Sequence, residues 1–114
     1  MRVRKLGPGD EAVAGEACRL FGSTGDLDVG LFLSRPEAHL FIAEDDAEIA
    51  GWVYGHELVH PDGERTMLLY ALDVDTRFQR RGFGRALVTE FVENARTIGC
   101  TEVWVLTDEA NGAG

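Results

Sequence analysis

The residues with the clearest chemical potential gather in the segment 79–84, which reads Gln-Arg-Arg-Gly-Phe-Gly. Four arginines fall in and around this segment with no acidic residue between them: Arg77, Arg80, Arg81 and Arg85. The whole chain has a formal net charge of -9, so this local positive charge is hard to ascribe to average surface composition. We expect the segment to bind an anion; the alternative is a helix start whose arginines simply face solvent.

Glycines in the same segment favour a phosphate as that anion. Gly82 and Gly84 place no side chain where a ligand would approach, and they accept backbone angles that other residues resist. Helical spacing of apolar residues begins directly afterwards, which predicts a helix whose first N–H groups are free to bind. Two other phosphate sites are excluded, because a dinucleotide fingerprint needs glycine where Leu87 stands, and a P-loop needs a lysine, whereas Lys5 is the only one.

A strand and a helix must hold this segment in place. Residues 67–74 are almost all apolar, which predicts a strand buried on both faces. The helix follows and ends at Gly99, with these apolar residues at helical spacing: Leu87, Val88, Phe91, Val92, Ala95 and Ile98. The basic segment is therefore expected to be the loop between a central strand and an amphipathic helix.

The rest of the chain predicts an α/β protein, a mixed sheet of the α+β kind with helices on its faces. The other expected elements are a strand at 3–6, a helix capped by Asp10 and ended at 22–25, a helix at about 28–34, and strands at 40–43, 49–58 and 102–107. Tight turns join the three middle strands, which makes them antiparallel. The long helix then crosses to a last strand, which we expect to be parallel to the central one.

Length and composition limit the class of protein. The 114 residues, 45% of them hydrophobic, predict a single domain spanning 1–114. The acidic balance argues against nucleic-acid binding and favours a cationic partner. No apolar run is long enough to cross a bilayer and no leader is evident, so we expect a cytoplasmic protein without a membrane partner. We expect no metal site: Cys18 and Cys100 predict buried, reduced thiols, and His56 and His60 predict surface or hairpin positions.

The basic segment resembles motif A of the GNAT acetyltransferases, Gln/Arg-x-x-Gly-x-Gly/Ala, which Gln79, Gly82 and Gly84 match. The resemblance implies the GNAT fold and acetyl-coenzyme A (acetyl-CoA) as co-substrate, with its pyrophosphate held by this loop. In that superfamily two parallel strands splay apart and the pantetheine arm of the cofactor bonds to the strand backbone in the gap. The cofactor-binding residues implied here are Leu72 and Val74, through their backbone, and Gln79, Arg80, Arg81, Gly82, Phe83, Gly84 and Arg85.

Acetyl transfer to an amine requires a group that removes a proton from the ammonium and a proton for the departing thiolate. Asp73 is the expected catalytic base, because it interrupts the apolar strand beside the implied thioester position; the alternative is a strand-end aspartate that bonds the loop. Tyr70 is the second catalytic candidate, with a core aromatic as its alternative. Asp108 and Glu109 are expected to bind the amine substrate, and a solvated strand end is the alternative for Glu109.

Within the superfamily, the stretches 69–74 and 104–109 resemble the aminoglycoside 3-N-acetyltransferase group, which implies a small polycationic amine as acceptor. That group often has a Tyr-Asp pair on the central strand, whereas Ala71 follows Tyr70 here. Its members also continue past the fifth strand, so the expected fold lacks their C-terminal helix and strands. We expect a homodimer that buries the apolar sheet edge left in this way. The alternative function is a catalytically defective acyl-CoA-binding or dimerisation module.

Overall fold

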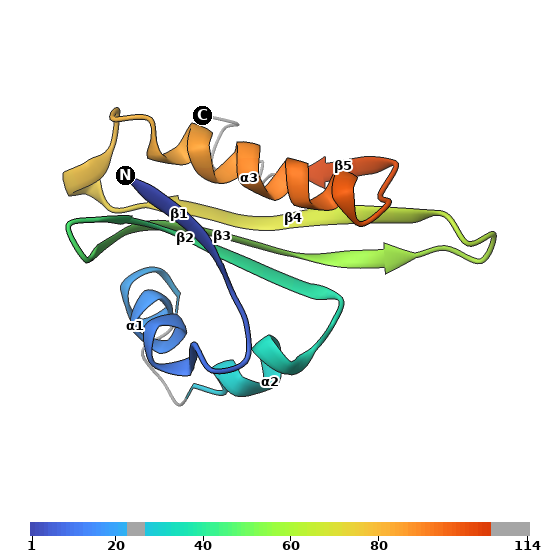
Figure 1. The fold of residues 1–114 in the computed structure, drawn as a ribbon, viewed down its shortest axis with the longest axis horizontal. Helices are drawn as coiled ribbons and strands as arrows, with labels where there is room; N and C mark the ends of the chain where they lie inside the picture. Colours follow the sequence, from blue (N-terminus) through green and yellow to red (C-terminus); the bar gives the residue numbers. More distant parts are fainter. Residues whose placement is uncertain (23–26, 106–114) are drawn as a thin grey trace.

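The computed structural model describes residues 1–22 and 27–105 and places a five-stranded sheet between two layers of helix (Figure 1). The strands lie in sequence order, β1-β2-β3-β4-β5. One face of the sheet is covered by α1 and α2 and the other by α3 (Figure 1). The elements are β1 (Arg2–Leu6), α1 (Glu11–Phe21), α2 (Val29–Ser34), β2 (Ala38–Asp45), β3 (Glu48–Val59), β4 (Arg65–Val74), the short 3-10 helix η1 (Thr76–Phe78), α3 (Phe83–Thr97) and β5 (Glu102–Val105).

Strand directions follow the pattern expected from the sequence. Each of β1 to β4 pairs antiparallel with its neighbour, and β5 runs parallel to β4 after the crossover through α3. The predicted mixed sheet is therefore confirmed. The predicted cap of α1 is wrong, because the Asp10 side chain accepts a hydrogen bond from the Gly7 backbone N–H (2.8 Å) and makes no bond to the helix. Its carboxylate closes the turn that precedes the helix.

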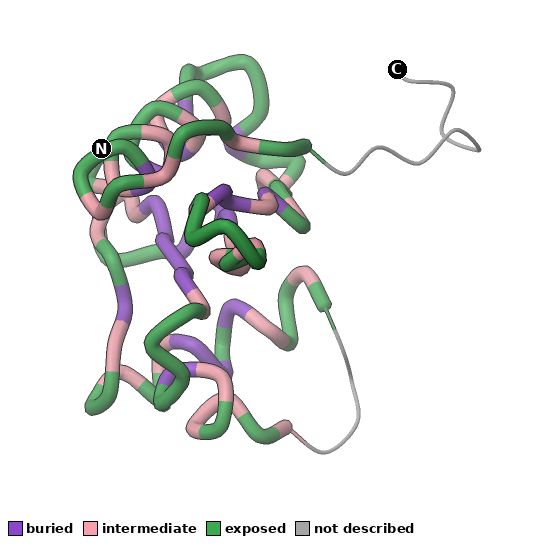
Figure 2. Tube along the Cα trace, turned by 90° about the vertical axis from the view of Figure 1, so that its right-hand side faces the viewer, coloured by how far each residue is buried: buried purple, intermediate pink, exposed green. Residues whose placement is uncertain are grey.

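Two apolar layers form the core, one on each face of the sheet. Figure 2 shows the buried segments in the interior of the molecule, between the helical layers. Beneath α3 the buried side chains include those of Phe41, Val53, Met67, Leu69, Phe78, Phe83, Leu87 and Phe91. Beneath α1 and α2 they include those of Leu6, Leu33, Leu40, Ile42, Ile49 and Trp52. Burial of this apolar surface is the main force that holds the three helices on the sheet.

Close packing of α3 against the sheet depends on a glycine in β3. A Cβ atom at Gly55 would lie 1.9 Å from the Leu68 carbonyl oxygen and 2.7 Å from Cζ of Phe91. Both distances are far below van der Waals contact, and one of the two atoms belongs to rigid backbone. Gly55 therefore lets the Phe91 ring sit directly on the sheet beneath the middle of α3.

The expectation that the central strand is buried on both faces holds only for its first half. Met67 and Leu69 are buried, whereas Tyr70 is 49% and Leu72 41% exposed. Tyr70 is an extra residue in the pairing with β3, since Tyr54 faces Ala71 and Gly55 faces Leu69. Such a β-bulge bends the strand and locally ends regular pairing. Among the described residues, β5 accompanies β4 only along residues 66–69, so the second half of β4 has an open edge.

A buried histidine ties β1, β2 and α3 together. His39 is only 4% exposed, and its Nδ1 atom accepts a hydrogen bond from Nζ of Lys5 at 2.8 Å. The Asn94 side chain lies beside the same nitrogen and also accepts from Lys5. The buried Nε2 of His39 has no partner among the described residues. Burial, with Lys5 as the next cause, lowers the pKa of His39 from 6.5 to about 4, so the ring is neutral in the folded protein at pH 7.

This depressed pKa predicts an acid-sensitive contribution to stability. The unfolded chain takes up the proton of His39 near pH 6.5, whereas the folded chain resists it down to about pH 4. The contribution is therefore complete above pH 6.5 and declines as the pH falls toward 4. In urea titrations, His39→Gln should reduce the difference in unfolding free energy between pH 7 and pH 4.5 by about 2 kcal/mol relative to the parent. Parallel pH curves for parent and variant would contradict the assignment.

Candidate active site

The loop between β4 and α3 ends in a set of free backbone donors. Gly82 precedes α3 with φ of 89°, a left-handed conformation that favours glycine, and Arg80 is also left-handed at 65°. The first helical bond runs from the Ala86 N–H to the Gly82 carbonyl. Within the described ranges, no acceptor bonds the main-chain N–H groups of residues 80–85. The start of α3 can therefore bind an anion, as a helix N-terminus does.

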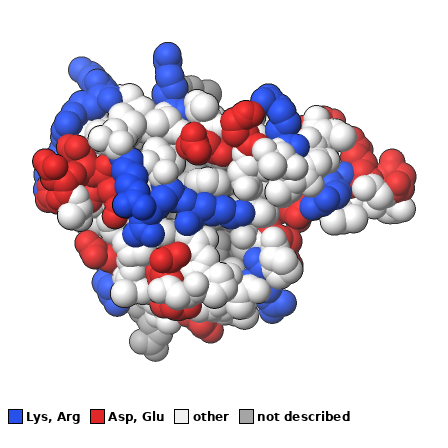
Figure 3. Space-filling model, viewed as in Figure 1, with Lys and Arg blue, Asp and Glu red and all other residues white. Residues whose placement is uncertain are grey.

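The arginines of the loop do not all remain free for that anion. Arg81 pairs with Asp45 (3.1 Å), and Arg77 pairs with Asp75 (3.3 Å) and with Glu48 (3.2 Å). The sequence places no acid among the arginines, but the fold brings the turn between β2 and β3 beside them. Figure 3 shows Lys and Arg at the end of the molecule where α3 begins, next to a group of acidic side chains.

Two of the four guanidinium groups have no carboxylate partner in the described part of the chain, those of Arg80 and Arg85, and both residues are exposed. Arg81, by contrast, also stacks near the rings of Phe78 and Phe83 at 5.4 and 5.5 Å. The Phe83 side chain itself is buried in the core. Arg80 and Arg85 are thus the loop cations best placed to meet a ligand.

The open edge of β4 lies beside this loop. In an antiparallel pair, successive residues alternately bond the partner strand and direct their polar backbone groups away from it. The Asp75 N–H donates to the Ala50 carbonyl of β3 at 2.8 Å, so Asp75 is a position that bonds β3. Val74 and Leu72 therefore direct their N–H and C=O groups away from β3, toward the open edge. Consistent with this, the Val74 carbonyl accepts a hydrogen bond from the Gln79 side chain at 3.2 Å. The Val74 N–H and both polar backbone groups of Leu72 are therefore available to a ligand that lies along the edge.

Asp73 and Tyr70 lie on the face of the sheet that α1 and α2 cover. Asp73 Oδ2 accepts a hydrogen bond from Nε1 of Trp52 at 2.9 Å, so the carboxylate contacts β3 rather than the following loop. Tyr70 stacks on Tyr54 with ring centroids 5.5 Å apart. It is half exposed, which rules out a role as a core aromatic. Burial raises the pKa of Tyr54, with Tyr70 as the next cause, so its hydroxyl stays protonated at neutral pH.

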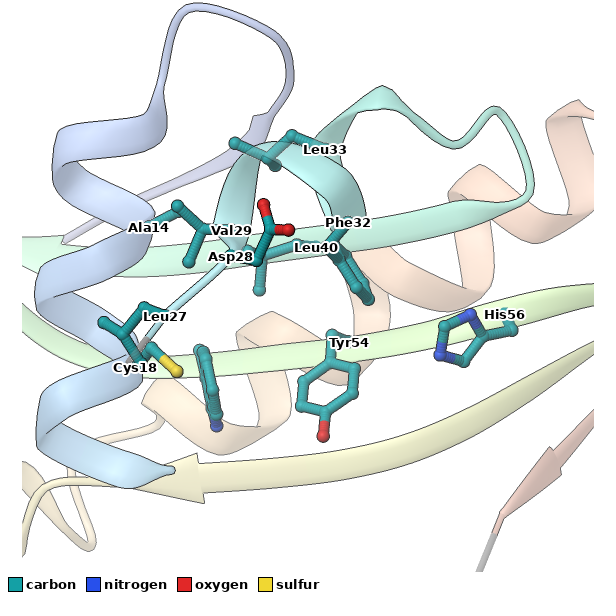
Figure 4. A pocket seen from close by; sticks show the side chains of 11 residues that line it. Ala14, Cys18, Leu27, Asp28, Val29, Phe32, Leu33, Leu40, Tyr54 and His56 are labelled. Carbon is teal, nitrogen blue, oxygen red and sulfur yellow. The ribbon is translucent and has the colours of Figure 1, made fainter. Parts of the chain in front are cut away.

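A hollow of about 440 Å³ opens on this same face, between β3 and the two N-terminal helices. Figure 4 shows side chains from β3, among them Tyr54 and His56, and from the two helices, among them Phe32, around this hollow. The lining residues are Ala14, Cys18, Leu27, Asp28, Val29, Phe32, Leu33, Leu40, Trp52, Tyr54 and His56. His56, for which a surface or hairpin position was predicted, lies on β3 of the β3–β4 hairpin and is half-buried in this wall. Cys18 and Cys100 are free, as predicted, but half-buried rather than buried.

Sequence reasoning did not identify the wall of this hollow. Residues 52, 54 and 56 alternate along β3, so their side chains share one face of the strand, and this period of two could have been read from the sequence. The predicted substrate residues Asp108 and Glu109 lie outside the described residues. Across the described ranges, no group of three His, Cys, Asp or Glu is placed to hold a metal, and no helix is long and apolar enough to span a membrane.

Comparison with known proteins identifies the family of this arrangement. Residues 13–113 match the model of the acetyltransferase (GNAT) family. No curated protein sequence matches the chain. A crystal structure of an aminoglycoside acetyltransferase from an uncultured soil metagenomic sample, in complex with trehalose, is 22% identical with a TM-score of 0.89, over 97% of this chain and 80% of that one.

Two further structures are similar. The same soil enzyme in complex with sisomicin gives 22% identity and a TM-score of 0.89, over 96% of this chain and 79% of that one. Ribosomal-protein-alanine N-acetyltransferase from Brucella melitensis biovar Abortus 2308 is 16% identical with a TM-score of 0.80, over 95% of this chain and 81% of that one. At these identities the structures establish the fold.

Changing each glycine of the loop to alanine should have different effects on stability and on coenzyme A binding: a loss of both at Gly82 and little change at Gly84. Gly82→Ala should lower the free energy of unfolding by about 1 to 2 kcal/mol, because its backbone is left-handed, and should weaken coenzyme A binding at least tenfold by displacing the N–H groups. Gly84→Ala is the matched control, since its Cβ would meet only Cγ2 of Val74 at an ordinary 3.6 Å. Calorimetric titration and thermal unfolding check both; equal behaviour of the two variants would contradict the assignment.

Proposed function

The chain belongs to the acetyltransferase (GNAT) family, and we propose that it transfers the acetyl group of acetyl-CoA to a primary amine of a small cationic substrate. Enzymes of this family use an acyl-CoA as co-substrate. One observation carries the proposal: the free main-chain N–H groups at the start of α3 adjoin the open edge of β4. On the same stretch of strand, Asp73 is bonded to Trp52 of the hollow's wall, so an anion site and a candidate base lie within one short segment.

The residues of the loop and strand fit a phosphate-bearing, amide-containing ligand. The N–H groups of residues 80–85 would hold the diphosphate, with Arg80 and Arg85 as additional cations. Arg81 would act by holding the loop, through its pair with Asp45. The backbone of Leu72 and Val74 would bond the pantetheine amides as an added strand does, which supplies partners for the Leu72 groups and the Val74 N–H on the open edge of the described strand. Gln79, which already bonds Val74, would border this edge.

Asp73 is the proposed catalytic base. When bound, acetyl-CoA supplies the acetyl group as a reactive thioester. The bond from Trp52 Nε1 fixes Oδ2 of Asp73, whereas Oδ1 has no partner among the described residues and can accept a proton from the substrate ammonium, directly or through water. Trp52 is then a positioning residue for the carboxylate. The Tyr70 hydroxyl, which is half exposed beside Tyr54, is the proposed proton donor to the departing sulfur.

An aminoglycoside or another small polyamine is the candidate acceptor that the similar structures suggest. The soil enzyme of 22% identity is an aminoglycoside acetyltransferase, and one of its two crystal structures contains sisomicin. The strongly acidic chain would attract such a cation over a distance. The acidic residues Asp108 and Glu109 remain candidates for binding the amine.

Replacement of the proposed base should separate chemistry from binding. Asp73→Asn keeps an acceptor for the Trp52 N–H but cannot take up a proton, so kcat for thiol release should fall about 100-fold with the KM for acetyl-CoA unchanged. Asp62→Asn is the matched control, since Asp62 also accepts one hydrogen bond but lies in the exposed turn before β4.

Unchanged turnover in Asp73→Asn would remove Asp73 from the mechanism. Coenzyme A binding by the parent protein without turnover on any amine would instead support an acyl-CoA-binding module.

We also propose a homodimer that buries the outer side of β5. Trp104 and Val105 of this strand are 52% and 62% exposed, and in the described part of the chain no strand lies beyond it. An exposed apolar edge strand is prone to pair with another chain. Sedimentation equilibrium should therefore show a dimer at micromolar concentration, which Val105→Lys dissociates and Leu20→Lys, on the opposite layer, does not. A monomer for the parent protein would refute this.

A further inference from the structure

The hollow between β3, α1 and α2 has a wall that is aromatic and apolar rather than acidic. We propose that the acceptor is an arylalkylamine, a primary amine on an aromatic body, whose ring occupies this hollow while its nitrogen lies toward Asp73. The inference rests on the proposed function, because it narrows the acceptor of the same site. It favours a single-amine substrate over an aminoglycoside.

Aromatic side chains form one continuous surface along the hollow. The ring of Tyr54 meets that of Phe32 edge-to-face at 5.6 Å and that of Trp52 at 5.1 Å. His56 extends the row, with its ring 5.5 Å from that of Phe32. Aromatic rings attract one another in such geometries beyond the area that they bury, so a flat substrate ring can join the cluster (Figure 4).

Charge in the described lining is sparse and of one sign. Asp28 is its only carboxylate, and one oxygen of that group already accepts the Leu31 N–H at the start of α2. No Lys or Arg is among the described lining residues. A second carboxylate, that of Asp73, adjoins the hollow through its bond to Trp52. This arrangement suits one ammonium group at the Asp73 end. Few other polar groups line the described wall: the second oxygen of Asp28, the Tyr54 hydroxyl and the His56 ring.

The sparse charge discriminates between amines. A polyamine or aminoglycoside carries several ammonium groups, and aminoglycosides add hydroxyls around every ring. Each such group loses water on entering the hollow and needs a polar partner, and the few that the described wall offers are not enough for all of them, which is costly. An arylalkylamine places apolar surface against Phe32, Leu33 and Leu40 and has one charge to satisfy. Burial of an arylalkylamine in the hollow is therefore favourable, whereas burial of a polycation is unfavourable.

Calorimetric titration of the coenzyme A-saturated protein tests this at 0.15 M salt. The probes are 2-phenylethylamine, ethanolamine with the same charge but no ring, spermidine and kanamycin. We expect 2-phenylethylamine to bind at least tenfold more tightly than each of the others. Phe32→Leu, which removes a ring but keeps an apolar side chain, should weaken 2-phenylethylamine about fivefold and leave ethanolamine unchanged; equal weakening of both would count against ring recognition.

The same four amines are then assayed for acetyl transfer. This assay distinguishes a failure of the arylalkylamine inference from a failure of the proposed transferase function. Tight binding of 2-phenylethylamine without its acetylation would support the inference and contradict the proposed transfer. Stronger binding or faster acetylation of kanamycin or spermidine would overturn the inference and leave the transferase intact. Binding of none of the amines would overturn it as well.

Discussion

The second half of β4 is the constraint on which the rest of the arrangement depends. The extra residue at Tyr70 interrupts the pairing with β3, and the partnership with β5 covers only residues 66–69 in the described chain. Polar backbone left in this way is costly unless something bonds it. At the same point the bulge brings the side chains of Tyr70 and Asp73 to the face that holds Tyr54 and Trp52. One irregularity therefore leaves an edge for a ligand and places two reactive groups against residues of the hollow's wall.

The two sides of the sheet differ in charge, with positive potential at the start of α3 and few charges along the aromatic wall. At the start of α3, free N–H groups and the unpaired guanidiniums of Arg80 and Arg85 provide positive potential in a chain of net charge -9. The acids of the β2–β3 turn neutralise Arg77 and Arg81 and so hold the loop. Across the sheet, the aromatic wall carries few charges. A phosphate-bearing donor and an amine acceptor would thus approach from different sides and meet at β4.

Periodicity and glycine placement made the framework predictable. The apolar run before the basic loop, the helical spacing after it and the crossover to β5 required only local rules, and the motif match identified the family. The paired arginines were not predictable, because Asp45 and Glu48 lie some thirty residues earlier and meet the loop only through the sheet register. The half-burial of β4 was missed for a similar reason: a bulge depends on which residues of β3 lie opposite. The buried polar group of His39 likewise depends on partners from β1 and α3.

The central claim is that the amides of residues 80–85 receive the diphosphate of acetyl-CoA. Its most direct test is a nuclear magnetic resonance titration of the 15N-labelled protein with coenzyme A, in which every backbone N–H is followed. The account predicts that the largest shifts fall on residues 80–85 and on Leu72 and Val74, while the β3–β4 turn around Gly63 stays unchanged. Saturable binding whose shifts lie elsewhere, with residues 80–85 unmoved, would contradict it.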